Sequence, residues 1–238
     1  MSLSSRSSIG AGSRYGVAVL IALAVALGTP ASSVAAQPAV RPAVALAGVT
    51  ESGRILGRSS APVTLAVFSD LQCPICAPFF LEVLPSLIPK WVDTGIVRLE
   101  YRSLQTATFE PTEFEEEVSA AYAAGAQNLQ WPYVESFFEE QKEEGSRYVN
   151  AAFLEQVAAG TPGLNGVAWH AHLSNPKYRR EMLEDEQLGS RHGIVGTPSF
   201  LIGRTGKTLH LFEPNEVSAP VYVASFAHAF KSVLHRKK

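Results

Sequence analysis

The chain has 238 residues, which is enough for one sizeable domain with an insertion. An apolar content of 46%, a charged content of 18% and a net charge of −2 are ordinary for a globular protein, and they give no reason to expect nucleic acid or an anionic membrane surface as a partner. Two cysteines are too few for a framework of disulfides, so the fold depends on its hydrophobic core.

Residues 1–36 have the pattern of an export signal. Two arginines precede a short apolar core over residues 15–28, and the small residues Val34-Ala-Ala36 predict cleavage before Gln37. Because this core is short for a bilayer span, a retained N-terminal anchor is the alternative reading. Either reading places the folded domain outside the cytoplasm, in the periplasm or the extracytoplasmic cell envelope. Residues 37–50, rich in proline, alanine and valine, are predicted to be a linker.

The next segments predict a β-α-β unit. A short strand is expected over Ser52–Leu56, a buried strand over Val63–Ser69 and a parallel partner over Ile96–Ser103. A helix connects the two long strands, and Pro85 and Pro89 are expected to bend or end it.

The chain's two cysteines, Cys73 and Cys76, stand between the first long strand and this helix. Free N–H groups and the positive end of the helix dipole would favour a thiolate at Cys73. Pro74 suits the first helical position, and Cys76, one turn further, would be less exposed. This arrangement predicts an attacking thiol and a resolving thiol of a redox pair.

Half of a zinc site is the competing interpretation of such a pair. A zinc site would need two more ligands. His170 and His172 are available, but two residues apart on a predicted helix they point in different directions. No metal and no cofactor are therefore expected.

The pattern turns helical between about residues 105 and 190. Thr112-Glu-Phe-Glu115 has the form of a capping box that opens a helix towards residue 127. Further helices are expected over residues 132–144, 151–159, 165–173 and 176–192, the last two opened by Asn165 and Asn175. The acidic runs at 115–117 and 139–144 are expected to be solvated helix faces. The aromatic residues of this block are expected in the core: Phe114, Tyr122, Trp131, Tyr133, Phe137, Phe138 and Phe153.

The end of the chain returns to strands, at Ser199–Ile202 and Thr208–Phe212, and closes with an amphipathic helix over Val221–His235.

Three segments together resemble the DsbA-like thiol–disulfide oxidoreductases. They are Gly57–Thr64, Phe68–Cys76 and Gly193-Ile-Val-Gly-Thr-Pro-Ser-Phe-Leu-Ile202. The resemblance implies an α/β, thioredoxin-like fold with an inserted all-helical subdomain. The thioredoxin-like domain would comprise residues 51–104 and 193–238, and the helical insertion residues 105–192.

The resemblance also implies roles for single residues. Cys73 and Cys76 would be catalytic, and Thr197 with a cis Pro198 would lie beside them and bind substrate. Pro74 and Ile75 would tune the redox potential. Since Ile75 stands where the best-known members have a histidine, a less oxidising couple is expected.

Asp70 is a further candidate near the cysteines. Val67 occupies the position where thioredoxins often carry a buried acid, whereas Asp70 matches a related Ser-Asp-x-x-Cys pattern. We expect Asp70 to be a loop or capping residue, with a proton relay as the alternative.

The implied function is that of an exported enzyme that introduces disulfides into secreted proteins. Its partners would be reduced secreted substrates and a membrane redox protein that recycles the cysteine pair. A reductase or isomerase of the same compartment is the first alternative. A non-enzymatic secreted domain, with the cysteines as a structural disulfide or zinc half-site, is the second.

Overall fold

The computed structural model describes residue 46, residues 48–215 and residues 218–235. The predicted export signal, or anchor, and most of the predicted linker lie outside these residues. The described residues belong to a single unit, residues 41–238. Within the described part of the chain, no helix has the length and apolar character needed to cross a membrane.

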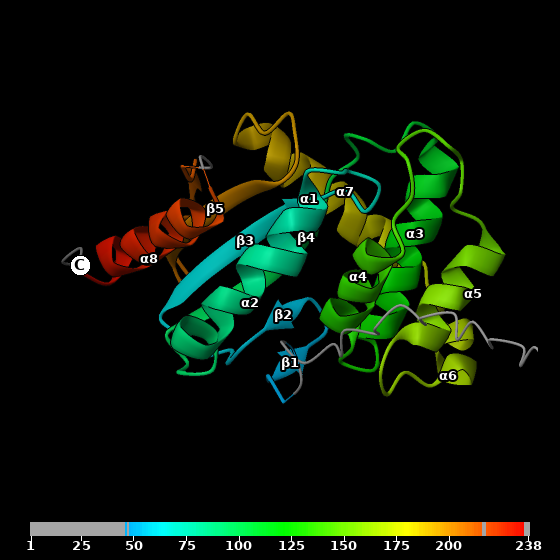
Figure 1. Ribbon diagram of the computed structural model, residues 1–238, viewed down its shortest axis with the longest axis horizontal. Coiled ribbons are helices and arrows are strands. Elements are labelled where there is room, and N and C mark those ends of the chain that lie inside the picture. The colour runs from blue at the N-terminus through cyan, green and yellow to red at the C-terminus, as the bar shows by residue number, and fades with distance from the viewer. Residues whose placement is uncertain (1–45, 47, 216–217, 236–238) are drawn as a thin grey trace, which may run out of the picture. The chain divides into compact units, whose positions relative to one another are not determined.

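A mixed sheet of six strands, ordered β1-β2-β4-β3-β5-β6, forms the centre of the thioredoxin-like fold (Figure 1). The parallel pair is β3 with β4, in which Val63 lies opposite Val97, and the other pairs are antiparallel. Because β3 is buried along its whole length, it is a continuous apolar run rather than an alternating one. The strands are β1 Glu51–Ser52, β2 Ile55–Leu56, β3 Val63–Ser69, β4 Val97–Ser103, β5 Ser199–Arg204 and β6 His210–Phe212.

The single strand predicted over residues 52–56 is wrong, because this segment is a tight hairpin. The strands β1 and β2 pair with each other, and Gly53 and Arg54 form the turn between them. Gly53 has a φ of 57°, which glycine adopts at little steric cost.

The helix that follows the cysteines continues through both prolines. It runs as α1 Cys76–Pro78, the π-helical turn η1 Phe79–Val83, α2 Leu84–Leu87 and the π-helical turn η2 Ile88–Val92. The prolines do not end it, because each is the second residue of a new segment, where a backbone N–H is not needed. We call residues 76–92 the active-site helix.

Six further helices complete the described chain. They are α3 Pro111–Gly125, α4 Gln130–Glu139, α5 Ala151–Gly160, α6 Gly166–His172, α7 Lys177–Arg191 and α8 Ala219–His235. In Figure 1 the active-site helix and α8 lie together on one face of the sheet, and α3 to α6 form a group at its side. Helix α7, which leads the chain back to the sheet, packs against both β4 and α3.

The helix ends follow local sequence chemistry in part. The Asn165 side chain accepts the Ala168 N–H at 2.9 Å and caps α6 as predicted. The capping box at Thr112 is wrong: α3 begins at Pro111, and Glu110 occupies the cap position without a side-chain bond. Proline is favoured as the first helical residue, which moves the helix start ahead of Thr112. Helix α4 ends at Glu139, five residues earlier than predicted.

The burial pattern confirms the predicted core. All seven aromatic residues assigned to it are buried, and two clusters of rings flank the active-site helix. Phe79 packs with Phe200 and Phe226 on one side, and Phe80 packs with Trp131 and Phe138 on the other. The same helix therefore joins the core of the sheet to the core of the helical group.

Candidate active site

The two cysteines lie where β3 gives way to the active-site helix. Cys73 precedes the helix, and the backbone N–H of Cys76, its first residue, donates to the Cys73 carbonyl at 3.1 Å. Pro74 thus stands before the first helical residue instead of occupying it. Both thiols are free and buried, Cys73 being 5% exposed, whereas the intervening Ile75 is 64% exposed.

The two thiols differ in acidity. Hydrogen bonding from the Cys76 thiol lowers the pKa of Cys73 to about 6 against the opposing effect of burial, and the Thr197 side chain and the backbone N–H groups of Cys76 and Ile75 also lower it. Burial and the neighbouring Cys73 raise the pKa of Cys76 well above its usual value. The lowered pKa favours the thiolate form of Cys73 near neutral pH, whereas Cys76 keeps its proton.

The segment around Thr197 and Pro198 lies against the cysteines, although it is more than 120 residues further along the chain. The Cys73 Sγ lies 3.3 Å from the Thr197 carbonyl oxygen, and the Thr197-Pro198 peptide bond is cis, as the resemblance implied. The Thr197 hydroxyl lies 2.6 Å from the Thr106 hydroxyl, in the loop after β4. The antiparallel pairing of β5 with β3 brings this segment back to the end of β3.

Asp70 is a buried carboxylate with five hydrogen-bond donors. One oxygen, Oδ1, accepts the Gln72 backbone N–H at 2.9 Å and the Thr108 hydroxyl at 2.6 Å. The other, Oδ2, accepts the N–H groups of Thr106, Ala107 and Thr108 at 2.7–3.0 Å. Asp70 thus ties the turn before the cysteines to the loop after β4, an arrangement that favours the loop-organising reading over the proton relay.

Two residues that sequence reasoning did not single out also hold this turn. The Gln141 side-chain amide donates to the carbonyl oxygens of Leu71 and Cys73, at 2.8 and 3.1 Å. Glu117 is fully buried and accepts a hydrogen bond from the Gln72 side chain at 3.0 Å.

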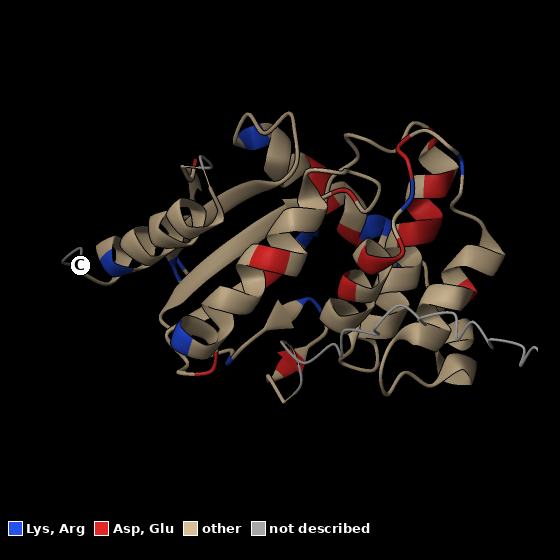
Figure 2. Ribbon diagram, viewed as in Figure 1, with Lys and Arg blue, Asp and Glu red and all other residues tan. Residues whose placement is uncertain are grey.

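The expected solvated face at 115–117 is therefore wrong for Glu117. Its spacing from Phe114 and Ala121, three residues before and four after, places it on the buried stripe of α3, and that spacing was the available signal. The other acidic run, 139–144, is largely exposed after α4 (Figure 2).

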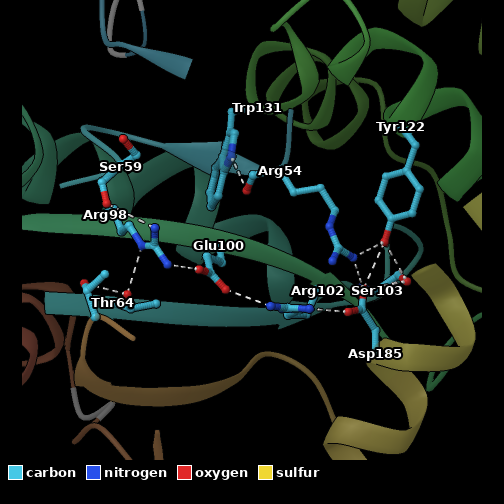
Figure 3. A network of polar contacts seen from close by, with 11 residues as sticks. Arg54, Ser59, Thr64, Arg98, Glu100, Arg102, Ser103, Tyr122, Trp131 and Asp185 are labelled. Atoms are coloured by element: carbon cyan, nitrogen blue, oxygen red, sulfur yellow. Dashed lines mark hydrogen bonds and ion pairs between the residues drawn. The ribbon is translucent and has the colours of Figure 1, made fainter. Parts of the chain in front are cut away.

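A second buried carboxylate, Asp185 of α7, binds the helical group to the sheet (Figure 3). It forms ion pairs with Arg54 at 2.7 Å and Arg102 at 2.9 Å. It also accepts the Ser103 backbone N–H and the Tyr122 hydroxyl, both at 3.0 Å. The network continues along β4 through Glu100 and Arg98 and ends at Thr64 of β3. With all these donors, Asp185 is a structural group.

No set of three or more His, Cys, Asp and Glu side chains among the described residues is arranged to hold a metal ion. The His170 ring nitrogen Nε2 lies 3.6 Å from a carboxylate oxygen of Glu155, within the helical group.

Residues 49–219 match the sequence profile of a family described as thioredoxin. The chain belongs to this thioredoxin family. It is similar to disulfide bond formation protein D of Bacillus subtilis, with 22% identity over 62% of this chain and 66% of that protein, so just under two thirds of the relative is spanned. A probable disulfide bond formation protein D of Bacillus anthracis is 20% identical over 62% of this chain and 68% of that protein.

Solved structures show the same fold. Oxidised BdbD of Bacillus subtilis superposes with a TM-score of 0.61 at 18% identity, covering 78% of this chain and 98% of that one. DsbA of Chlamydia trachomatis superposes with a TM-score of 0.60 at 17% identity, covering 76% and 91%. The thioredoxin-like fold with inserted helices is thus the fold of DsbA proteins.

Proposed function

We propose that this thioredoxin-family protein is an exported thiol–disulfide oxidoreductase that forms disulfides in reduced secreted proteins. The observation that carries the proposal is the unequal pair of thiols at the start of the active-site helix. Cys73, with a pKa of about 6, is suited to be the reactive thiolate, and Cys76, with a raised pKa, is suited to be the resolving thiol. The names of the curated relatives support the same chemistry.

In the proposed reaction, a substrate thiolate attacks the Cys73 sulfur of the Cys73–Cys76 disulfide. A new sulfur–sulfur bond joins substrate to Cys73, and the electron pair of the broken bond leaves on Cys76, which takes up a proton. A second substrate thiolate then attacks the substrate sulfur of this mixed disulfide and releases the Cys73 thiolate. Two electrons pass from substrate to enzyme, and the low pKa of Cys73 makes it a good leaving group in the second step.

We infer that Thr197 and Pro198 form the substrate site. The short distance between the Cys73 sulfur and the Thr197 carbonyl supports this assignment, because a substrate bound to that sulfur would lie along this backbone. A groove of mixed polar and apolar lining continues from Pro198, with Ile194, Leu211 and Glu213 among its residues. Such a groove suits an extended segment of an unfolded protein.

Export, cleavage before Gln37 and recycling by a membrane redox partner belong to the same proposal. An oxidase that has received two electrons must pass them on before its next turnover, and the chain offers no cofactor motif for that step. Pro74 and Ile75 are proposed to set the potential. An isoleucine adds neither a positive charge nor a polar donor to stabilise the Cys73 thiolate, so it favours a less oxidising couple than a histidine would.

The decisive experiment measures both the redox equilibrium of the Cys73–Cys76 pair and its reaction with a reduced substrate protein. The purified protein is equilibrated with reduced and oxidised glutathione, and the oxidised protein is mixed with a reduced, unfolded substrate protein. We expect stoichiometric formation of substrate disulfides, a mixed disulfide trapped by Cys76→Ala, and little trapping by Cys73→Ala. Stable reduction by physiological glutathione without substrate oxidation would instead support a reductase or isomerase. Unreactive cysteines in the folded protein would refute an enzymatic role.

A further inference from the structure

Two buried carboxyl groups, those of Asp70 and Glu117, both lie within hydrogen-bonding distance of the Thr108 hydroxyl group, next to the turn at residues 70–73. The Thr108 Oγ1 lies 2.6 Å from Asp70 Oδ1 and 3.0 Å from Glu117 Oε1. A threonine hydroxyl has one hydrogen and can donate to only one of these oxygens. The other contact is a full hydrogen bond if a carboxyl group supplies its hydrogen. The two distances therefore fit a pair in which one carboxyl group is protonated.

The surroundings assign this proton to Glu117. Asp70 accepts four backbone N–H groups, which stabilise its negative charge. Glu117 is completely buried, and among the described residues its second oxygen accepts one hydrogen bond, from the Gln72 side-chain amide. Burial, and then the charge of Asp70, raise the pKa of Glu117 well above its usual value. The hydrogen-bond chain thus runs from Glu117 through the Thr108 hydroxyl to the Asp70 carboxylate.

The other titratable groups near Glu117 do not change this assignment. Glu113 lies on the same helix, one turn earlier, with its Oε2 3.5 Å from the Gln72 amide nitrogen. Burial raises the pKa of Tyr101 of β4, Tyr133 of α4 and Tyr148, and an ionised Glu117 would raise it further. Among these groups from the described chain none is a cation, so an ionised Glu117 would add a second buried negative charge beside Asp70.

Glu117 is connected to Cys73 through the neighbouring residue Gln72. Gln72 precedes Cys73, and its side chain is held by Glu117 while its backbone N–H is held by Asp70. The Cys73 N–H donates to the Asp70 carbonyl at 3.1 Å within the same turn. We propose that Glu117, as a neutral carboxylic acid, is a positioning residue that holds the turn at residues 70–73 in the geometry that favours the Cys73 thiolate. The inference rests on the proposed function and adds a pH-dependent control of the same site.

Ionisation of Glu117 as the pH rises would reverse this effect. Its Oε1 would no longer donate to Thr108, so the hydroxyl could serve only one of two negative oxygens. The second charge would also oppose the thiolate and so destabilise the reduced protein. We therefore expect the glutathione equilibrium to shift towards the oxidised protein as Glu117 ionises, an effect separate from the ionisation of Cys73 itself.

The test uses Glu117→Gln and Glu117→Ala, with Glu116→Gln as matched control because that residue is exposed on the same helix. The pH dependence of Cys73 alkylation and the glutathione equilibrium are measured on the purified full chain. Glutamine can donate to Thr108 and accept from Gln72, so it should keep the neutral-pH reactivity but lose the shift of the glutathione equilibrium that ionisation of Glu117 causes. Alanine should shift the glutathione equilibrium by about fivefold towards the oxidised protein, the effect of about one lost hydrogen bond. The control should match the wild type.

Infrared spectroscopy gives a direct readout of the proton. Burial also raises the pKa of Glu51 to about 8 and that of Glu135 to about 7, so the carbonyl region near neutral pH is compared between variants. The band of a buried protonated carboxylic acid should lose intensity in Glu117→Gln relative to the wild type and keep it in Glu116→Gln. Equal intensity in all three proteins would overturn the proposal, as would wild-type Cys73 titration in Glu117→Ala.

A second variant keeps the proposal testable if Glu117→Ala does not fold. Gln72→Ala removes the same connection and should shift the glutathione equilibrium by a similar factor, whereas an unchanged equilibrium would contradict the proposal. These measurements need no protein substrate. A failure to oxidise substrates would therefore contradict the proposed function, while the Cys73 titration and the infrared band would still decide the role of Glu117.

Discussion

The reduced protein should lose stability as the pH falls, because the Cys73 thiolate favours the folded state. The pKa of Cys73 changes from an ordinary value of 9.0 to about 6 on folding. A group whose pKa is lower in the folded state stabilises the fold fully at pH values above its unfolded pKa. This stabilisation is lost as the pH falls through its folded pKa. For these two values the contribution is about 3 kcal/mol at about pH 8 and falls almost to zero at about pH 5. Cys76 stays protonated across this range and adds nothing to the change.

Urea unfolding of the reduced protein measures this contribution. The free energy of unfolding is determined between about pH 5 and 8 for the wild type and for Cys73→Ser, which lacks the thiolate but keeps every other titrating group. The difference between the two proteins should shrink by about 3 kcal/mol on acidification. A difference that stays constant over this range would refute the argument that folding stabilises the Cys73 thiolate.

Three further substitutions test the surroundings of the cysteines. Asp70→Asn turns an amide N–H towards backbone donors and should lower the free energy of unfolding by about 3 kcal/mol. The control Asp93→Asn changes an exposed residue and should not lower it. Equal effects of the two substitutions in urea unfolding would contradict the buried network. Asp185→Asn weakens a buried pairing with two arginines and should cost about 3 kcal/mol by the same assay. Its control, Glu184→Gln, lies exposed beside it and should cost almost nothing, so similar losses would be unexpected. Ile75→His should shift the glutathione equilibrium towards the reduced protein by about tenfold, and an unchanged equilibrium would argue against redox tuning at this position.

Much of the fold follows from local patterns in the sequence. The apolar run at Val63–Ser69 predicts the central strand at its observed bounds, because full burial needs no alternation. Asn165 identifies the start of α6 by capping chemistry alone. The closeness of Thr197 to Cys73 followed only from the family resemblance, since nothing local connects residues so far apart in the chain.

The buried charges could not be derived in the same way. Asp185 pairs with Arg54, 131 residues away, and Glu117 with Gln72, 45 residues away. Acidic residues in helices are normally solvated, so composition favours the surface for both. Their places on the apolar stripes of α3 and α7 show that they are buried, but only the packed fold shows which partners satisfy them.

The pairing of Asp185 with Arg54 and Arg102 also limits how this architecture can be shortened. The carboxylate belongs to the helical insertion, whereas both arginines belong to the sheet region that precedes it in the chain. A chain trimmed of its insertion would leave Arg54 without its carboxylate partner and would remove the ring contacts of Tyr122 and Trp131 with Tyr101 of β4. A minimal thioredoxin-like domain therefore cannot be obtained from this protein by deletion alone. It would also require new residues at the positions of the two arginines, so the insertion and the sheet have to change together.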